Sequence, residues 1–290
     1  MKRIHSIACT AAVLLIAACA ALGQRTASLA DNAALRYWSA FSQLQDTGLT
    51  DQEAKELDSV LEKLAPFDLS KYDALIQKNA PALQIMARGT SLPNCDWGLD
   101  YGLAESVPVD YARKALALGR LNILYVMRLY HSGDRDGALT ALAAGLRFSR
   151  DVANGGTFFP TLVAKDLIVT HLMAVDAALR MGQLTAGERS QLQKAVTAMG
   201  DGLDWSNAAK RELDLLDAHY HHEARISQAL DRIAPPYEAS LNDESKLANA
   251  QDAIKSAPSD LANLIPNPKR ILEQKQELSA KLQQTRALLR

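Results

Sequence analysis

The segment at residues 159–181 constrains the fold more than any other part of the sequence. Its large apolar side chains recur at the spacing of an α-helix and cover more than one helical face: Phe159, Leu162, Val163, Leu167, Ile168, Leu172, Val175 and Leu179. A helix that is apolar on more than one side needs other elements around it. We therefore expect this helix to be the central and most buried one in the protein.

The amino-acid composition favours helices along the whole chain. The 290 residues include 48 Ala and 44 Leu, against 22 Val and Ile together. Alanine and leucine have high helix propensity, whereas valine and isoleucine favour strands. The sequence therefore predicts an all-α fold of antiparallel helical hairpins, either tetratricopeptide-like or an irregular bundle, which follows an N-terminal export signal.

Charge and motif content exclude several classes of function. Lys and Arg total 32 and Asp and Glu total 33, so there is no basic excess to bind a phosphate backbone, and no nucleic-acid partner is expected. The sequence also lacks glycine-rich phosphate-binding motifs and the Gly-x-Ser-x-Gly motif of hydrolases. We predict no cofactor and no catalytic residue, and we favour a protein that is not an enzyme.

The first residues have the pattern of an export signal. Lys2 and Arg3 precede an apolar stretch at residues 7–18, which is shorter than the roughly 20 residues of a membrane-spanning helix. Two processing sites fit this signal. Residues 16–19 match the lipobox of bacterial lipoproteins, which gives a signal peptide of residues 1–18 and an acylated Cys19. Residues 21–23 instead fit ordinary cleavage after Gly23, and a buried apolar N-terminal helix is the alternative without export.

The mature chain divides into two predicted regions. Residues 31–235 are expected to form a helical-hairpin domain, which includes a longest helix from about residue 204 to just before Pro235. Residues 236–290 contain few large apolar side chains and are expected to form a polar helical tail. The last helix, at residues 267–290, carries a thin apolar stripe, which predicts either docking on a partner, a coiled coil or a marginal solvated helix.

One helical hairpin shows a repeat-like pattern. A tight turn at residues 132–134 separates expected helices at 109–131 and 135–152. Ala138, Leu142 and Gly145 follow the spacing of small and large residues in tetratricopeptide repeats, whereas Val126 stands where a smaller residue is usual. A second hairpin at residues 159–199 lies at too loose a period for a regular array. Both a solenoid-like groove for a peptide or protein and an ordinary bundle fit this pattern.

The chain resembles a group of exported, uncharacterised all-helical bacterial proteins. The likeness is carried by the segment Asn32-Ala-Ala-Leu-Arg-Tyr-Trp-Ser-Ala-Phe41, by the loop motif at residues 95–98 and by the hairpin at residues 112–152. It covers residues 31–202. The resemblance implies an export signal and a tetratricopeptide-like helical body, and it implies no catalytic residue.

The long connector at residues 89–108 contains the candidate site motif Cys95, Asp96, Trp97 and Gly98. A catalytic thiol needs a base, and the available histidines, His131 and His171, lie in expected helices. No known catalytic cysteine signature surrounds Cys95. We therefore predict a structural loop that Cys95 and Trp97 anchor to the helical body.

A histidine cluster is the other candidate site. His219, His222 and Glu223 lie close together in the expected long helix, and His219 and Glu223 are four residues apart, so that they could share one cation. The segment lacks the His-Glu-x-x-His and Glu-x-x-His spacings of known metal sites. The competing interpretation is a polar helix flank whose histidines titrate near neutral pH.

These features predict a binding or scaffold protein of the bacterial cell envelope with no chemistry of its own. The expected ligand is a protein or peptide of the envelope. The expected location is the periplasm, with a membrane anchor if Cys19 is acylated, or otherwise the cell exterior. The alternative function is an envelope metal-dependent hydrolase that uses His219, His222 and Glu223.

Overall fold

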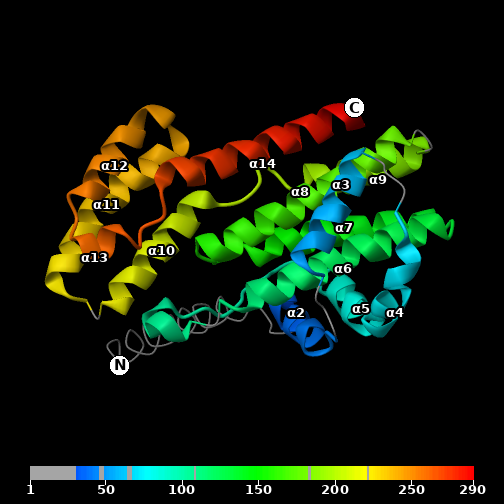
Figure 1. The fold of residues 1–290 in the computed structure, drawn as a ribbon, viewed down its shortest axis with the longest axis horizontal. Coiled ribbons are helices and arrows are strands. Elements are labelled where there is room, and N and C mark those ends of the chain that lie inside the picture. Colours follow the sequence, from blue (N-terminus) through cyan, green and yellow to red (C-terminus); the bar gives the residue numbers. More distant parts are fainter. Residues whose placement is uncertain (1–30, 46–48, 64–66, 108, 182–183, 221) are drawn as a thin grey trace, which may run out of the picture.

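A computed structural model describes residues 31–45, 49–63, 67–107, 109–181, 184–220 and 222–290 (Figure 1). Most of these residues are helical, and no β-strand forms among them. The all-α prediction is therefore confirmed for the described part of the chain. The export signal expected at residues 1–23, including Cys19, lies outside the described residues.

Three long helices form the centre of the molecule. Helices α6 (Tyr111–His131), α7 (Arg135–Val152) and α8 (Phe158–Arg180) pack side by side in up-down-up order. The turn between α6 and α7 uses Gly133 at φ 85°, a conformation that glycine adopts without a Cβ clash. Asp134 then caps α7 by accepting a hydrogen bond from the backbone nitrogen of Gly137.

Helix α8 is buried on several faces, as expected from the sequence. Val163, Leu167, Ile168, Leu172 and Val175 are all less than one-tenth exposed. The helix contacts α3, α6, α7, α10 and α14, so that it has neighbours on most sides. No helix in the described ranges is both long enough and apolar enough to cross a membrane.

The N-terminal helices cover part of this centre. Helices α2 (Ala33–Ser42) and α5 (Ala80–Gly89) pack on each other and on α6 and α7, while α4 (Asp73–Lys78) leads into α5. Pro81 lies in the first turn of α5, where its missing N–H group leaves no helical bond unmade. Helix α3 (Asp51–Lys63) packs on α8.

The hairpins do not stack as a regular repeat array. Helix α9 (Ala186–Thr197), which begins at a complete capping box of Thr185 and Glu188, packs mainly on α7 and on α14 (Pro268–Leu289). A second tetratricopeptide-like hairpin would require α9 to pack along α8. Of the two architectures expected from the sequence, the structure therefore matches the irregular bundle.

The expected long helix from residue 204 is divided in two. Helix α10 (Trp205–His219) ends at a turn in which His222 has φ 59°, and α11 (Ala224–Asn242) then continues through Pro235 and Pro236. The boundary expected after residue 235 falls inside α11. Tyr237 and Leu241 are buried beyond the prolines, so tertiary packing outweighs the two missing backbone donors.

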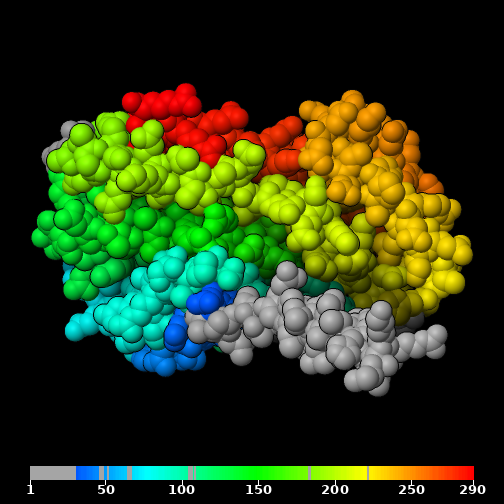
Figure 2. Space-filling view, turned by 180° about the vertical axis from the view of Figure 1, so that it is seen from behind, coloured from blue at the N-terminus to red at the C-terminus, as the bar shows by residue number. Residues whose placement is uncertain are grey.

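The C-terminal region packs against the rest of the molecule. Helices α12 (Leu247–Lys255) and α13 (Ser259–Ala262) lie beside α11, and α14 runs back along α8 and α9 (Figures 1 and 2). Leu278, Leu282 and Leu289 of α14 are each at most 2% exposed. The expected polar tail is therefore part of the folded body, because its thin apolar stripe has a surface to cover.

Candidate functional site

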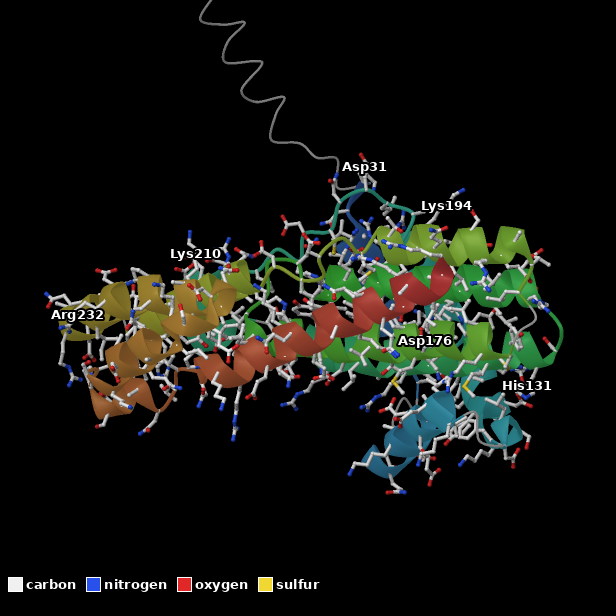
Figure 3. The ribbon with its side chains drawn as sticks, turned by 90° about the horizontal axis from the view of Figure 1, so that it is seen from above. Asp31, His131, Asp176, Lys194, Lys210 and Arg232 are labelled. Carbon is white, nitrogen blue, oxygen red and sulfur yellow. The ribbon has the colours of Figure 1, made fainter. Side chains whose placement is uncertain are left out.

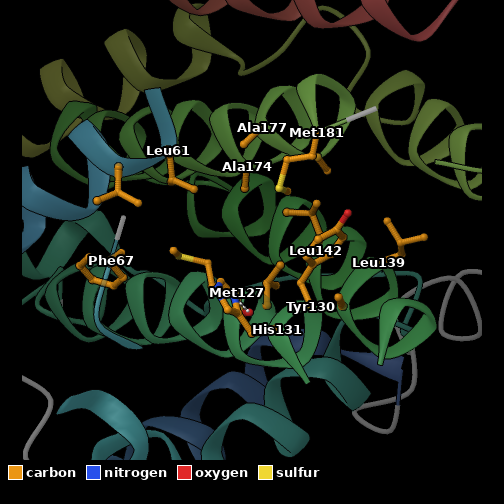
Figure 4. A pocket seen from close by; sticks show the side chains of 14 residues that line it. Leu61, Phe67, Met127, Tyr130, His131, Leu139, Leu142, Ala174, Ala177 and Met181 are labelled. Atoms are coloured by element: carbon orange, nitrogen blue, oxygen red, sulfur yellow. Dashed lines mark hydrogen bonds between the residues drawn. The ribbon is translucent and has the colours of Figure 1, made fainter. Parts of the chain in front are cut away.

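An apolar cleft opens between α3, α6, α7 and α8, beside the turn at residues 132–134 (Figure 4). Its volume is about 330 Å³, near the lower end of the range for small-molecule sites. Fourteen residues line it: Val60, Leu61, Phe67, Val126, Met127, Tyr130, His131, Ala138, Leu139, Leu142, Ala174, Ala177, Ala178 and Met181. An apolar group of modest size could therefore bind here.

Small side chains on α7 and α8 create the space. Ala138, Ala174, Ala177 and Ala178 each place a single methyl group where a larger side chain would fill the cleft. Met127 and Met181 also line it, and methionine adapts its shape to different contacts. Met181 is 42% exposed, so that its side chain has room to move.

Helix α3 forms one wall of the cleft and is attached to α8 by hydrogen bonds. The guanidinium of Arg180 donates to the carbonyl oxygens of Leu61 (2.7 Å) and Glu62 (2.6 Å), which caps the end of α3. Thr170 donates a longer bond of 3.5 Å to the carboxylate of Asp58. These bonds fix the wall by its backbone while leaving its apolar side chains to face the cleft.

Polar groups in the cleft are few. The Tyr130 hydroxyl is buried and has no hydrogen-bond partner among the described residues. The Arg135 guanidinium lies 5.7 Å from the Tyr130 ring centroid and binds the Glu188 carboxylate, with 2.8 Å between Nε and Oε1. His131 Nδ1 donates to the Met127 carbonyl oxygen at 3.1 Å. Among the described residues that line the cleft, Tyr130 is therefore the one with a buried polar side-chain atom that lacks a partner.

A second polar cluster lies deeper, between α6, α7 and α8. His171 Nδ1 donates to the Leu167 carbonyl oxygen (2.7 Å), and Asn122 Nδ2 donates to His171 Nε2 (3.2 Å) and to the Ala141 carbonyl oxygen (3.0 Å). Burial lowers the pKa of His171 to about 4, although its hydrogen bond to Leu167 raises that pKa in part. The imidazole is therefore neutral near pH 7 and serves to satisfy buried polar atoms.

The loop motif at residues 95–98 packs down on the helical body. Trp97 Nε1 donates to the Asp151 carbonyl oxygen at 2.8 Å, and Cys95 Sγ lies 3.6 Å from the same oxygen. The Asp96 carboxylate accepts a bond from the Gly98 nitrogen at 2.9 Å, and Gly98 has φ 66°. Each residue of the motif thus has an identifiable contact or backbone role.

Asp151 connects this loop to the helices. Its carboxylate, 1% exposed, accepts from the Tyr37 hydroxyl (2.8 Å) and from Arg147 Nε (2.9 Å). Burial raises the pKa of Asp151, and Arg147 opposes that rise. Burial and then the Asp151 charge raise the pKa of the Cys95 thiol well above its usual value. This environment disfavours the thiolate that a nucleophile needs.

The three candidate metal ligands lie at the junction of α10 and α11. His219 ends α10, and His222 Nδ1 lies 2.8 Å from Asp217 Oδ2. Glu223 is the N-cap residue before α11, and its carboxylate lies 3.9 Å from Arg225. No group of three or more His, Cys, Asp or Glu side chains that could hold a metal ion occurs in the described ranges. The metal site therefore stays a prediction from the sequence.

Sequence reasoning did not identify the cleft. Met127, Tyr130, Leu139 and Leu142 follow the same helical spacing as buried core residues, and spacing alone does not tell whether a neighbouring side chain fills the space. The alanines at 174, 177 and 178 were the available signal, since three small residues near the end of one helix leave room beside it.

Comparisons with protein-family models, curated proteins and solved structures gave no match. The fold and the cleft themselves define a class. The described chain is an all-α protein with a three-helix centre, and the N-terminal helix α3 forms one wall of an apolar cleft against it.

Proposed function

We propose that the protein is an exported helical binding protein of the bacterial cell envelope, which takes an apolar group of its ligand into the cleft. The observation that carries this proposal is the apolar lining on four helices, with open space left by four alanines. Removing apolar surface from water is favourable in free energy, so an apolar group should bind in this cleft. A leucine, methionine or aromatic side chain of the protein or peptide ligand expected from the sequence is one such group, and the hydrocarbon chain of a small amphiphile is another.

Export remains part of the proposal through the N-terminal signal pattern. Mass spectrometry of the N-terminus from native membranes distinguishes the two processing sites. A diacylglyceryl-modified Cys19 supports a lipid-anchored protein, and an unmodified start at Gln24 supports a secreted one. A native chain that begins at Met1 would contradict export.

The cleft is tested by filling it. We expect an apolar solvatochromic naphthalene dye to bind the purified protein saturably, with the blue shift of an apolar environment. Ala177→Trp places an indole in the cleft and should abolish that binding. Ala248→Trp, on the exposed face of α12, is the matched control and should bind the dye as the native protein does. Circular dichroism verifies that both variants fold, and equal dye binding by both would contradict the proposal.

The alternative function, an envelope metal-dependent hydrolase, uses His219, His222 and Glu223. Among the described residues of the α10–α11 junction, no distance or contact adds support to it beyond the sequence. Metal analysis of the purified protein at neutral pH tests it directly, because a hydrolase of this kind requires stoichiometric metal.

A further inference from the structure

The Tyr130 hydroxyl points to the chemistry of the ligand. Its oxygen is closed off from water and has no hydrogen-bond partner in the part of the chain that the structure describes. Buried hydroxyls in native proteins nearly always have a partner, because leaving one unpaired destabilises the fold. A phenylalanine at this position would avoid that cost. A bound ligand with a hydrogen-bonding atom would give the hydroxyl its missing partner.

The surroundings of Tyr130 favour a ligand head with negative charge. The Arg135 guanidinium, a fixed positive charge, lies 5.7 Å from the Tyr130 ring centroid. Its partner Glu188 offsets part of that charge. Hydrogen bonds from a phenol to a carboxylate are stronger than those to a neutral acceptor. A carboxylate near Tyr130 would therefore gain both a charge-assisted bond and a favourable field.

The rest of the lining favours an unbranched apolar chain over a peptide. An extended peptide carries a donor and an acceptor on each residue, and among the described lining residues only Tyr130 and His131 have polar side chains. A helical peptide would satisfy its own backbone but would enter through apolar side chains, which leave the Tyr130 hydroxyl unpaired. A hydrocarbon chain has no polar atoms to leave unsatisfied along Ala174, Ala177 and Ala178.

We propose that the cleft binds a single-chain amphiphile with a carboxylate head, of the fatty-acid type, and that Tyr130 Oη donates a hydrogen bond to that head. This inference rests on the proposed function of the cleft and names its ligand class. The chain lies along the alanines of α8, and the flexible side chains of Met127 and Met181 move to admit the head to Tyr130. Tyr130 is then the residue that distinguishes a carboxylate from other heads.

The experiment compares two probes of equal chain length by isothermal titration calorimetry. Decanoate has a hydrogen-bond-accepting head, whereas decyltrimethylammonium has a head that accepts none. We expect the native protein to bind decanoate more tightly than decyltrimethylammonium. Tyr130→Phe should weaken decanoate binding about tenfold or more, since the bond is made to a charged group, and should change decyltrimethylammonium binding less than about twofold. The melting temperature of the empty variant should be unchanged or raised.

Further variants separate this inference from the proposed function. Ala177→Trp should abolish binding of both probes, and Ala248→Trp should leave both unchanged. Equal effects of Tyr130→Phe on the two probes, or no effect on decanoate, would overturn the role of the hydroxyl. If neither amphiphile binds but a synthetic amphipathic helix of leucine and lysine does, in a manner that Ala177→Trp blocks, the amphiphile is wrong and the cleft function stands. If the dye also fails to bind, both proposals fail.

Discussion

Asp176 on the buried helix α8, labelled in Figure 3, binds Lys281 on α14, with 2.6 Å between Oδ2 and Nζ. It also accepts a bond of 2.8 Å from the Thr285 hydroxyl. Lys165, whose side chain is 6% exposed, also binds α14, through an ion pair of 2.7 Å with Glu277. Two charged groups on the most buried helix therefore position the C-terminal helix.

Replacing Asp176 should loosen this attachment. In Asp176→Ala, Lys281 loses its partner while its side chain is only 20% exposed, so we expect a loss of about 2–3 kcal/mol in the free energy of unfolding. Urea denaturation followed by circular dichroism measures the loss, and hydrogen exchange should increase first in α14. Asp252→Ala is the control, because Asp252 and its partner Lys255 are both about three-quarters exposed. Equal losses in the two variants would contradict the role assigned to Asp176.

The close packing of α7 against α6 and α8 depends on Gly145. A Cβ at this position would lie 2.1 Å from His171 Nε2 and 2.4 Å from Asn122 Nδ2. Gly145→Ala should therefore separate the helices or break the Asn122–His171 bond, at a cost of about 3 kcal/mol in thermal or urea unfolding. Gly187→Ala, where the nearest atom is Thr185 Oγ1 at 4.0 Å, should instead stabilise α9 by up to about 1 kcal/mol. A neutral Gly145→Ala would show that the three helices pack less closely than described.

The pattern around Gly145 shows what the sequence could and could not predict. Ala138, Leu142 and Gly145 identified a closely packed hairpin, and α7 begins and ends where its cap and turn residues indicate, since these signals are local. The polar pair that Gly145 accommodates lies on α6 and α8, and single-chain spacing does not show which residues of different helices meet. The docking of α14 was missed for the same reason, because its partners Lys165 and Asp176 are over a hundred residues away.

In one region of the chain, one local signal was misleading and another was absent. Pro235 and Pro236 predicted a helix end, but α11 continues through them because Tyr237 and Leu241 are buried on its far side. The break before α11 falls at His222, whose positive φ carries no signal in the sequence because the residue is not glycine. Of the candidate ligands, His219 consequently ends α10 and Glu223 is the N-cap residue before α11, which the periodicity of one helix did not anticipate.

Stability should fall on acidification partly through His171. Burial lowers its pKa to about 4 in the folded protein, against about 6.5 in the unfolded chain, so the unfolded chain binds the proton first. The contribution of the neutral imidazole is fully present above about pH 6.5 and is lost as the pH falls towards 4, a change of about 3 kcal/mol. Asp151 acts in the opposite direction because burial raises its pKa.

The His171 contribution is measured as a difference between proteins. Urea unfolding between pH 7 and pH 4.5 should give a shallower loss of stability in His171→Gln than in the native protein, since the other titrating groups are common to both. His131→Gln, at an exposed residue near the end of α6, should keep the native slope. An NMR titration of the His171 ring that gives a pKa near 6.5 would contradict burial as the cause.

The final prediction concerns the loop that Trp97 anchors. Its ring is stacked on Tyr111 with 4.2 Å between centroids, and its Nε1 donates to the Asp151 carbonyl oxygen. Trp97→Phe keeps an aromatic ring but leaves that buried carbonyl without the indole donor. Trp38→Phe removes a comparable area from the same aromatic cluster, in which Trp38 lies 5.9 Å from Trp97. We expect Trp97→Phe to cost about 1–2 kcal/mol more than Trp38→Phe, which is the effect of the lost hydrogen bond. Equal costs in urea unfolding would mean that the ring stacking alone holds the loop. As a second measurement, the Cys95 thiol should react faster with iodoacetamide in Trp97→Phe, which releases the loop, and not in Trp38→Phe.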